Sequence, residues 1–235
     1  MKRIAPVTIP WSAVALLFAW PILAARGATT QPSEQPTSQP AHRFENEIRA
    51  FEAADQKQMP PANATLFVGS SSIRIWTTVA ADFPEFKTIN RGFGGSEIAD
   101  STYYADRIIV PYHPSRIVFY AGDNDLAAGK SAEQVHAEFQ AFVHKVRSEL
   151  PDAPIYFLAI KPSILRWKLV DKIKEANRLI AQDIAADPSL HYVDVFTPML
   201  GPDGKPRKEL FKPDGLHMVR AGYELWISIL KPILD

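Results

Sequence analysis

Residues 65–76 have the sequence T-L-F-V-G-S-S-S-I-R-I-W. The apolar run at residues 66–68 follows a β-branched threonine and precedes a glycine, which is typical of a buried strand in a parallel sheet. Three serines come directly after this strand, at the position where open α/β sheets bind their ligands. Such a serine is either the N-cap of the next helix or a nucleophile, and the motif alone favours the cap.

Strand and helix patterns alternate over the rest of the chain. We predict strands at residues 65–68, 87–90, 115–121, 154–160 and 191–195. We predict helices at residues 43–58, 131–150, 169–184 and 223–230. Strands that alternate with helices form a parallel sheet with helices on both faces. The sequence therefore predicts an α/β fold with about five parallel strands in a flavodoxin-like order.

The first 27 residues have the layout of a secretory signal peptide. Two basic residues near the start precede a largely apolar run at residues 7–25, and small residues follow it. Pro10 and Pro21 interrupt the run, which argues against a permanent membrane helix. We therefore expect an exported protein, periplasmic or secreted, with no stable membrane insertion once residues 1–27 are removed. An uncleaved anchor is the alternative.

Residues 28–42 contain three prolines among Ser, Thr and Gln and lack the apolar residues that a folded core needs. We interpret them as a linker to a folded domain at residues 43–235. The chain has no cysteine, so disulfides, a lipid-attached cysteine and thiol chemistry are all excluded. Export without disulfides suits a bacterial periplasm or culture medium.

The charge balance gives no sign of a nucleic-acid partner. The chain has 26 basic and 26 acidic residues. Cleavage after Gly27 would remove three basic residues and no acidic one, which leaves 23 basic and 26 acidic residues. A protein that binds nucleic acid usually carries a basic patch or stripe, and this composition offers none.

The loop before the last predicted helix contains Asp214 and His217, with Gly215 between them. A carboxylate at this spacing can hold one ring nitrogen of the imidazole, which leaves the other free to take a proton from a serine. The alternative is that Asp214 caps the last helix and His217 is an exposed residue of its first turn. No other histidine has an acidic neighbour at a predicted strand end, and no metal-ligand spacing is present, so we expect no metal site.

Two further loops follow predicted strands. In R-G-F-G-G-S, residues 91–96, the glycines could present a backbone N–H to an anion. In G-D-N-D, residues 122–125, an asparagine amide could point over the end of the sheet, although these residue types also dominate simple turns. A hydroxyl, an Asp–His pair, an amide and a glycine N–H at one sheet edge are the parts of a serine acyl hydrolase.

These four blocks, in this order, resemble the SGNH hydrolases, also called the GDSL esterase family. The blocks are G-S-S, N-R-G-F-G-G-S, G-D-N-D and D-G-L-H. The residues around the serines do not fit the G-x-S-x-G motif of ordinary α/β-hydrolases. The resemblance covers residues 43–235 and implies a three-layer flavodoxin-like fold and ester hydrolysis without a cofactor.

The resemblance also assigns roles to individual residues. It implies Ser71 as the nucleophile, His217 as the base and Asp214 as the partner of His217. It implies an oxyanion hole made by the N–H groups of Ser71 and Gly95 and by the side-chain amide of Asn124.

One position departs from the family pattern. Where the family commonly has aspartate in G-D-S, this chain has Ser70, so Ser70, Ser71 and Ser72 all compete for the position of the nucleophile. Residues 166–168, R-W-K, follow the fourth predicted strand. They are either a rim of the substrate cleft or, as we expect, the solvated start of a helix.

The sequence therefore predicts an exported serine carboxyl-ester hydrolase that removes short acyl groups through an acyl-enzyme, with O-acetyl groups on carbohydrate as one substrate class. Its partner would be a small-molecule or carbohydrate ester. A lysophospholipase-like or thioesterase-like acyl hydrolase is the alternative within the same chemistry. A non-catalytic module that binds carbohydrate or the cell envelope on the same scaffold is the alternative outside it.

Overall fold

The computed structural model describes residues 43–234. The predicted signal peptide at residues 1–27 and the predicted linker at residues 28–42 lie outside the described residues. Within them, no helix combines the length and the apolar character that crossing a bilayer requires.

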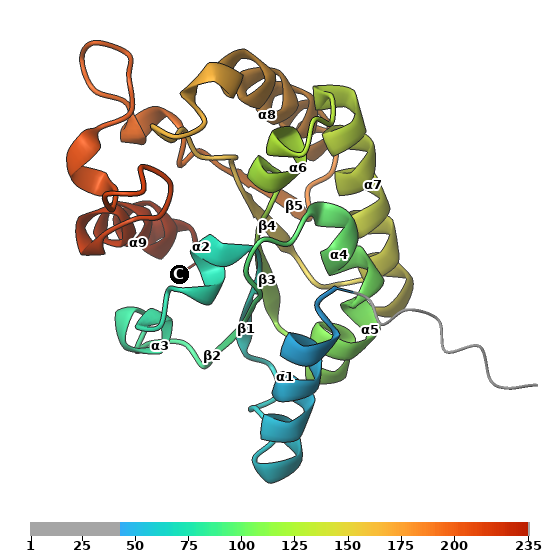
Figure 1. The fold of residues 1–235 in the computed structure, drawn as a ribbon. Coiled ribbons are helices and arrows are strands. Elements are labelled where there is room, and N and C mark those ends of the chain that lie inside the picture. The colour runs from blue at the N-terminus through green and yellow to red at the C-terminus, as the bar shows by residue number, and fades with distance from the viewer. Residues whose placement is uncertain (1–42, 235) are drawn as a thin grey trace, which may run out of the picture. The chain divides into compact units, whose positions relative to one another are not determined.

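A five-stranded parallel sheet forms the centre of the domain (Figure 1). Its strands are β1 (Thr65–Gly69), β2 (Thr88–Gly92), β3 (Arg116–Tyr120), β4 (Ile155–Leu158) and β5 (Leu190–Val193). They lie in the order β2-β1-β3-β4-β5, and every neighbouring pair is parallel. The predicted strand number and the flavodoxin-like order are confirmed.

Helices cover both faces of the sheet (Figure 1). On one face, α7 (Ala132–Glu149) contacts both α4 (Ile98–Tyr103) and α8 (Val170–Ala185). On the other face, α9 (Arg220–Leu234) lies beside α2 (Ser71–Arg74). The three-layer α/β architecture that the family resemblance implies is therefore confirmed.

Adjacent residues of β3 show how the layers are held together. Successive side chains of a strand point to opposite faces of the sheet. Phe119 stacks on Phe142 of α7, with ring centroids 3.9 Å apart. Its neighbour Tyr120 packs on Trp226 of α9, with centroids 5.2 Å apart. All four rings are buried, and burial on both faces explains why the apolar residues of β1, β3 and β4 are consecutive rather than alternating.

The N-terminal helix α1 (Glu45–Lys57) is tied to the domain by ion pairs. Arg107 Nε lies 2.6 Å from Glu52 Oε1, and Arg91 pairs with Asp55. The amphipathic helix predicted at residues 43–58 is therefore present and packed on the domain.

A serine capping box begins α7. Ser131 Oγ accepts a hydrogen bond from Gln134 N at 3.2 Å, and Gln134 Oε1 accepts one from Ser131 N at 2.8 Å. The shorter helices had no signal in the sequence, because three to six residues do not show a helical period. These are α3 (Val79–Asp82), α4, α5 (Ala105–Ile108), α6 (Asp123–Ala127) and the 3₁₀ turns Val110–Tyr112, Trp167–Leu169, Thr197–Met199 and Lys208–Leu210.

Gly69, the last residue of β1, is required by the approach of β3. Its φ is +129°, and a Cβ there would lie 1.9 Å from the carbonyl oxygen of Tyr120. We expect Gly69→Ala to lower the free energy of unfolding by about 3 kcal/mol or more, because the clash is with backbone and cannot be relieved by a rotamer. Denaturant unfolding monitored by circular dichroism measures this loss.

Gly129→Ala is the matched control. Gly129 also has a positive φ, +103°, but nothing lies within 4 Å of the position of its Cβ. We expect only the left-handed backbone cost of about 1–2 kcal/mol. Equal losses in the free energy of unfolding for the two variants would show that the close approach of β3 does not restrict residue 69 to glycine.

Candidate active site

The three serines after β1 have different surroundings. Ser70 is the N-cap residue of α2, and its N–H donates to Tyr120 O at 2.9 Å. The residues Ser70 and Ser72 are each only 1% exposed, whereas Ser71 is partly exposed. Tyr223 OH donates to the backbone oxygen of Ser72 at 2.9 Å, which fixes the first turn of α2. Of the three, Ser71 is therefore the one whose hydroxyl a substrate can reach.

Ser71, His217 and Asp214 form a continuous hydrogen-bonded chain. His217 Nε2 lies 3.0 Å from Ser71 Oγ, and His217 Nδ1 lies 2.7 Å from Asp214 Oδ2. The structure thus brings together side chains that are 146 residues apart in the sequence. Both distances are within the range in which an imidazole can take a serine proton while a carboxylate orients its other nitrogen.

Asp214 does not cap the last helix, so that alternative is wrong. Helix α9 begins only at Arg220. Asp214 Oδ1 instead accepts the N–H groups of Leu216 and His217, each at 2.9 Å. A positive φ of +65° at Gly215 permits this tight turn. One carboxylate oxygen of Asp214 thus shapes the loop, and the other contacts the imidazole.

The hydrogen bonds of this turn keep Asp214 ionised. The N–H of Leu216, followed by the side chain and the N–H of His217, lowers the pKa of Asp214 to about 2. The loop itself is closed by Lys212 N, which donates to His217 O at 2.7 Å, and by the antiparallel bridge between Phe211 and Met218. A charged carboxylate is therefore held against His217 at any pH above about 4.

Gly95 and Asn124, the residues expected in the oxyanion hole, lie on adjoining segments. Asn124 is in the first turn of α6, and its Nδ2 donates to the backbone oxygen of Ser96 at 2.9 Å. The hydroxyl of Ser96 closes the glycine-rich turn by donating to Phe93 O at 2.9 Å. Gly95 has a φ of +82°, and nothing lies within 4 Å of the position of its Cβ. The glycine therefore faces open space next to the asparagine.

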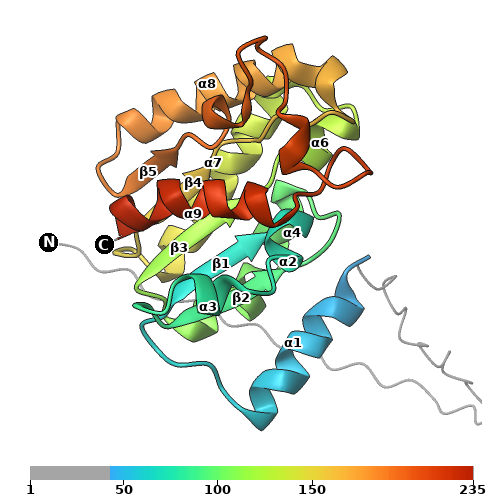
Figure 2. The ribbon, with the colours of Figure 1, turned by 90° about the vertical axis from the view of Figure 1, so that its left-hand side faces the viewer.

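The order of the strands explains why these loops meet. Strand β1 lies between β2 and β3, so Gly69 is paired with both Gly92 and Tyr120. The loops that carry Ser71, Gly95 and Asn124 begin at the carboxyl ends of β1, β2 and β3, and the loop that carries Asp214 and His217 directly precedes α9. Figure 2 shows α2, α4 and α6 gathered at one end of the sheet, next to the start of α9. This edge is where open parallel sheets bind their ligands.

Sequence reasoning missed the surroundings of Asn124. The expectation that residues 166–168 are the solvated start of a helix is wrong for Arg166. The side chain of Arg166 is only 15% exposed. Arg166 Nη2 donates to Asn124 Oδ1 at 2.7 Å, and Arg166 Nη1 lies 2.9 Å from Asp123 Oδ2. Lys161 Nζ lies 3.2 Å from the same oxygen. No local pattern could predict these contacts, because the partners are about 40 residues apart.

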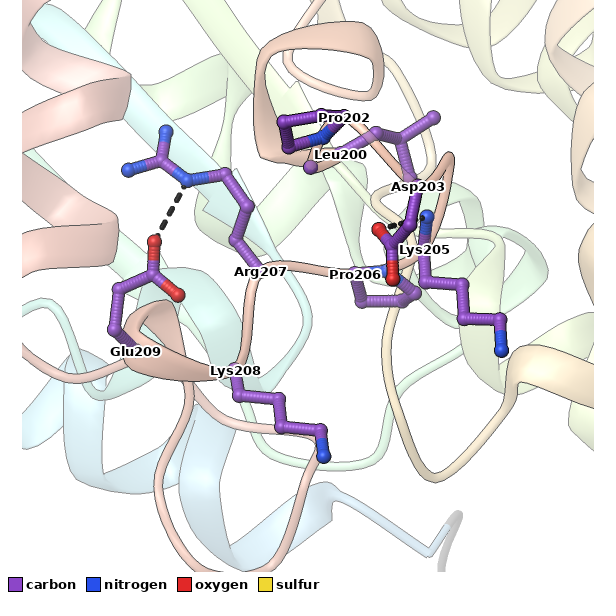
Figure 3. Close-up of a pocket in the computed structure, with 9 residues that line it drawn as sticks. Leu200, Pro202, Asp203, Lys205, Pro206, Arg207, Lys208 and Glu209 are labelled. Atoms are coloured by element: carbon purple, nitrogen blue, oxygen red, sulfur yellow. Dashed lines mark hydrogen bonds and ion pairs between the residues drawn. The ribbon is translucent and has the colours of Figure 1, made fainter.

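One surface cavity of the described residues lies away from this site. It has a volume of about 810 Å³ and is lined by residues of the loop at 200–209 (Figure 3). Asp203 Oδ1 accepts a hydrogen bond from Lys205 N at 3.1 Å, and Arg207 Nε lies 2.8 Å from Glu209 Oε1 (Figure 3). None of the candidate catalytic residues lines this cavity.

The described residues offer no cluster of three or more histidine or acidic side chains suited to a metal ion.

Residues 62–225 match the GDSL-like Lipase/Acylhydrolase family. The chain belongs to this family. It is accordingly a hydrolase of ester bonds, as the four sequence blocks indicated.

Among curated relatives, this chain is 26% identical over 179 residues to platelet-activating factor acetylhydrolase IB subunit alpha1 from Homo sapiens. The alignment covers 72% of this chain and 74% of the human protein. The counterpart from Mus musculus is 25% identical over the same length, with 72% and 73% covered.

Solved structures have the same fold. A Streptococcus pneumoniae protein described as a platelet activating factor superposes with a TM-score of 0.72 at 22% identity, covering 81% of this chain and 92% of that one. A GDSL-like lipase from Bacteroides thetaiotaomicron has a TM-score of 0.67 at 16% identity, covering 80% and 96%. A carbohydrate esterase family 3 protein from Talaromyces cellulolyticus has a TM-score of 0.61 at 14% identity, covering 73% and 96%. At these identities the likeness concerns the fold.

Proposed function

We propose that this GDSL-like hydrolase is an exported serine carboxyl-esterase that removes short acyl groups through an acyl-enzyme. The observation that carries the proposal is the hydrogen-bonded chain from Ser71 through His217 to Asp214. A protein that only binds carbohydrate or the cell envelope has no use for a hydroxyl, a base and a carboxylate in this order, so the chain argues against the non-catalytic alternative.

The mechanism has two steps. His217 Nε2 takes the proton of Ser71 Oγ as that oxygen attacks the ester carbonyl, and the charge of Asp214 stabilises the resulting imidazolium. The tetrahedral oxyanion accepts hydrogen bonds from the N–H groups of Ser71 and Gly95 and from the Asn124 amide. His217 then gives its proton to the departing alkoxide, which leaves an acyl-serine. A water molecule activated by His217 attacks this ester and releases the acid and free Ser71.

Acetyl esters, including O-acetyl groups on carbohydrate, are the substrates we propose first. An exported enzyme would meet acetylated polysaccharides, and the signal-like layout of residues 1–27 supports export. The curated relative from Homo sapiens is by its name an acetylhydrolase, and a fold neighbour is a carbohydrate esterase.

A lysophospholipase-like activity is the second candidate, and one surface feature favours it. Ile164 and Leu165 are 40% and 59% exposed, and Leu165 N donates to Gly215 O at 3.0 Å. Two exposed apolar side chains thus lie beside the turn that carries Asp214. These two side chains could contact an alkyl chain of a substrate, whether that chain belongs to the acyl group or to the leaving group.

A series of p-nitrophenyl esters separates the two candidates. We expect kcat/KM to be highest for the acetate and to fall by about 10-fold or more by the octanoate, because a site for a small acyl group does not accommodate added methylenes. Leu165→Ser serves as the matched variant, and it should leave acetate hydrolysis unchanged. A preference for octanoate or palmitate that Leu165→Ser abolishes would instead establish the lipid-like activity.

A further inference from the structure

Two cationic side chains from one loop are largely shielded from solvent, and one of them contacts Asn124 of the candidate oxyanion hole. Lys161 and Arg166 both lie between β4 and α8, and their side chains are 1% and 15% exposed. A buried cation is costly unless it is paired, so its partners indicate what it is there to hold.

Asp123 is the shared partner of these cations. Its Oδ2 lies 2.9 Å from Arg166 Nη1 and 3.2 Å from Lys161 Nζ. Lys161 also donates to Tyr120 OH at 3.0 Å. Burial alone would raise the pKa of Asp123, but the charges of Lys161 and Arg166 outweigh it and hold the pKa below its usual value. Asp123 is thus a buried carboxylate that fixes the guanidinium in one orientation.

The other end of the guanidinium contacts Asn124. Arg166 Nη2 donates to Asn124 Oδ1 at 2.7 Å, while Asn124 Nδ2 donates to Ser96 O at 2.9 Å. The amide cannot be flipped, because its NH₂ group would then face a guanidinium that has only donors. Both ends of the amide are therefore held, and one of its two N–H bonds remains for a ligand.

We propose that Arg166 is a positioning residue that orients the Asn124 amide toward the oxyanion, with Asp123 and Lys161 holding Arg166 in place. The proposal rests on the proposed esterase mechanism. An oxyanion hole works because its donors are fixed before charge develops, so an amide free to rotate would stabilise the transition state less. A cation on the carbonyl side also polarises the amide, which makes the remaining N–H a stronger donor.

A purely structural role for Arg166 predicts a different result. If Arg166 serves only as the partner of Asp123, its loss lowers stability and affects activity independently of Asn124. If Arg166 binds substrate directly, its loss raises KM. Only a role through Asn124 makes the effect on kcat disappear when the amide itself is absent.

The test is a double-mutant cycle on p-nitrophenyl acetate hydrolysis. We expect Asn124→Ala to lower kcat by about 10²–10³-fold. We expect Arg166→Met to lower kcat by about 10–100-fold, with KM changed by less than about twofold. In the Asn124→Ala background, Arg166→Met should cost less than about threefold in kcat. Arg178→Met, which removes an exposed arginine paired with Glu175 on α8, is the matched control and should leave kcat unchanged.

Arg166→Lys extends the test if the methionine variant fails to fold. It keeps a cation beside Asp123, but its single ammonium cannot bridge Asp123 and Asn124 as the planar guanidinium does. We expect Arg166→Lys to have a near-normal unfolding midpoint and a reduced kcat. When Asn124→Ala is already present, we expect Arg166→Lys to change kcat little further. Equal losses of kcat in both backgrounds, or a change in KM alone, would overturn the proposal. Either result would leave the esterase mechanism intact, which Ser71→Ala tests separately.

Discussion

Ser71→Ala is expected to lower kcat for p-nitrophenyl acetate by about 10⁴-fold or more, to the level that binding and the oxyanion hole sustain without a nucleophile. The reason is that Ser71 Oγ is the hydroxyl hydrogen-bonded to His217, 3.0 Å from Nε2. Steady-state hydrolysis, followed by the absorbance of p-nitrophenol, measures the loss. An unchanged unfolding midpoint would show that the loss is chemical.

Ser70→Ala is the matched control, because it removes a neighbouring hydroxyl of the same kind. Ser70 Oγ is buried and has no hydrogen-bond partner in the described part of the chain. Removing an unpaired buried hydroxyl should leave stability unchanged or slightly higher. Activity should stay within about threefold of the original enzyme, since such substitutions away from the chemistry are usually mild. Loss of activity in Ser70→Ala with retention in Ser71→Ala would reverse the assignment of the nucleophile.

His217→Ala should be as damaging as Ser71→Ala, about 10⁴-fold or more in kcat, and combining the two substitutions should cost little further. The reason is that the serine and its base act as one unit, so removing either one removes the activated nucleophile. The measurement is kcat for the two single variants and the double variant. Multiplicative losses in the double variant would show that Ser71 and His217 act independently.

Asp214 gives a sharper version of the same test. Its Oδ1 must accept two backbone N–H groups, so Asp214→Asn would place its carbonyl oxygen there and its NH₂ against His217 Nδ1. The imidazole would then carry its proton on Nε2 and could not accept one from Ser71. We expect about a 10⁴-fold loss for Asp214→Asn and a smaller loss for Asp214→Ala, which lets water reach Nδ1. An asparagine variant more active than the alanine variant would contradict this tautomer argument.

The sheet could be predicted because its strands are buried on both faces. Residues 66–68, 117–121 and 155–160 are apolar runs with a glycine or proline at one end, and this pattern depends only on local sequence. The choice of Ser71 over Ser70 and Ser72 could not be predicted as firmly. That choice depends on how the backbone turns into a helix of only four residues, and such a helix leaves no periodic signal.

The residues that hold Asn124 in place could not be predicted from the sequence, for a different reason. Arg166 contacts Asn124 only because β3 and β4 are neighbours, which brings the loops after them together. A charged side chain in a loop is usually solvated, so the residue type and the loop position of Arg166 led to the wrong expectation. His217 and Asp214 were found because they carry both their own chemistry and a short spacing. Arg166, Lys161 and Asp123 have no such spacing.

Covalent trapping tests the central claim most directly, because it locates the nucleophile without relying on a loss of activity. The enzyme is treated with a fluorophosphonate, which forms a stable adduct with an activated serine. Digestion and mass spectrometry then identify the modified residue. We predict one adduct per chain, on Ser71, in step with the loss of activity and absent from Ser71→Ala. An adduct on Ser70, Ser72 or another residue that accompanies inactivation would contradict the assignment of Ser71 as the nucleophile.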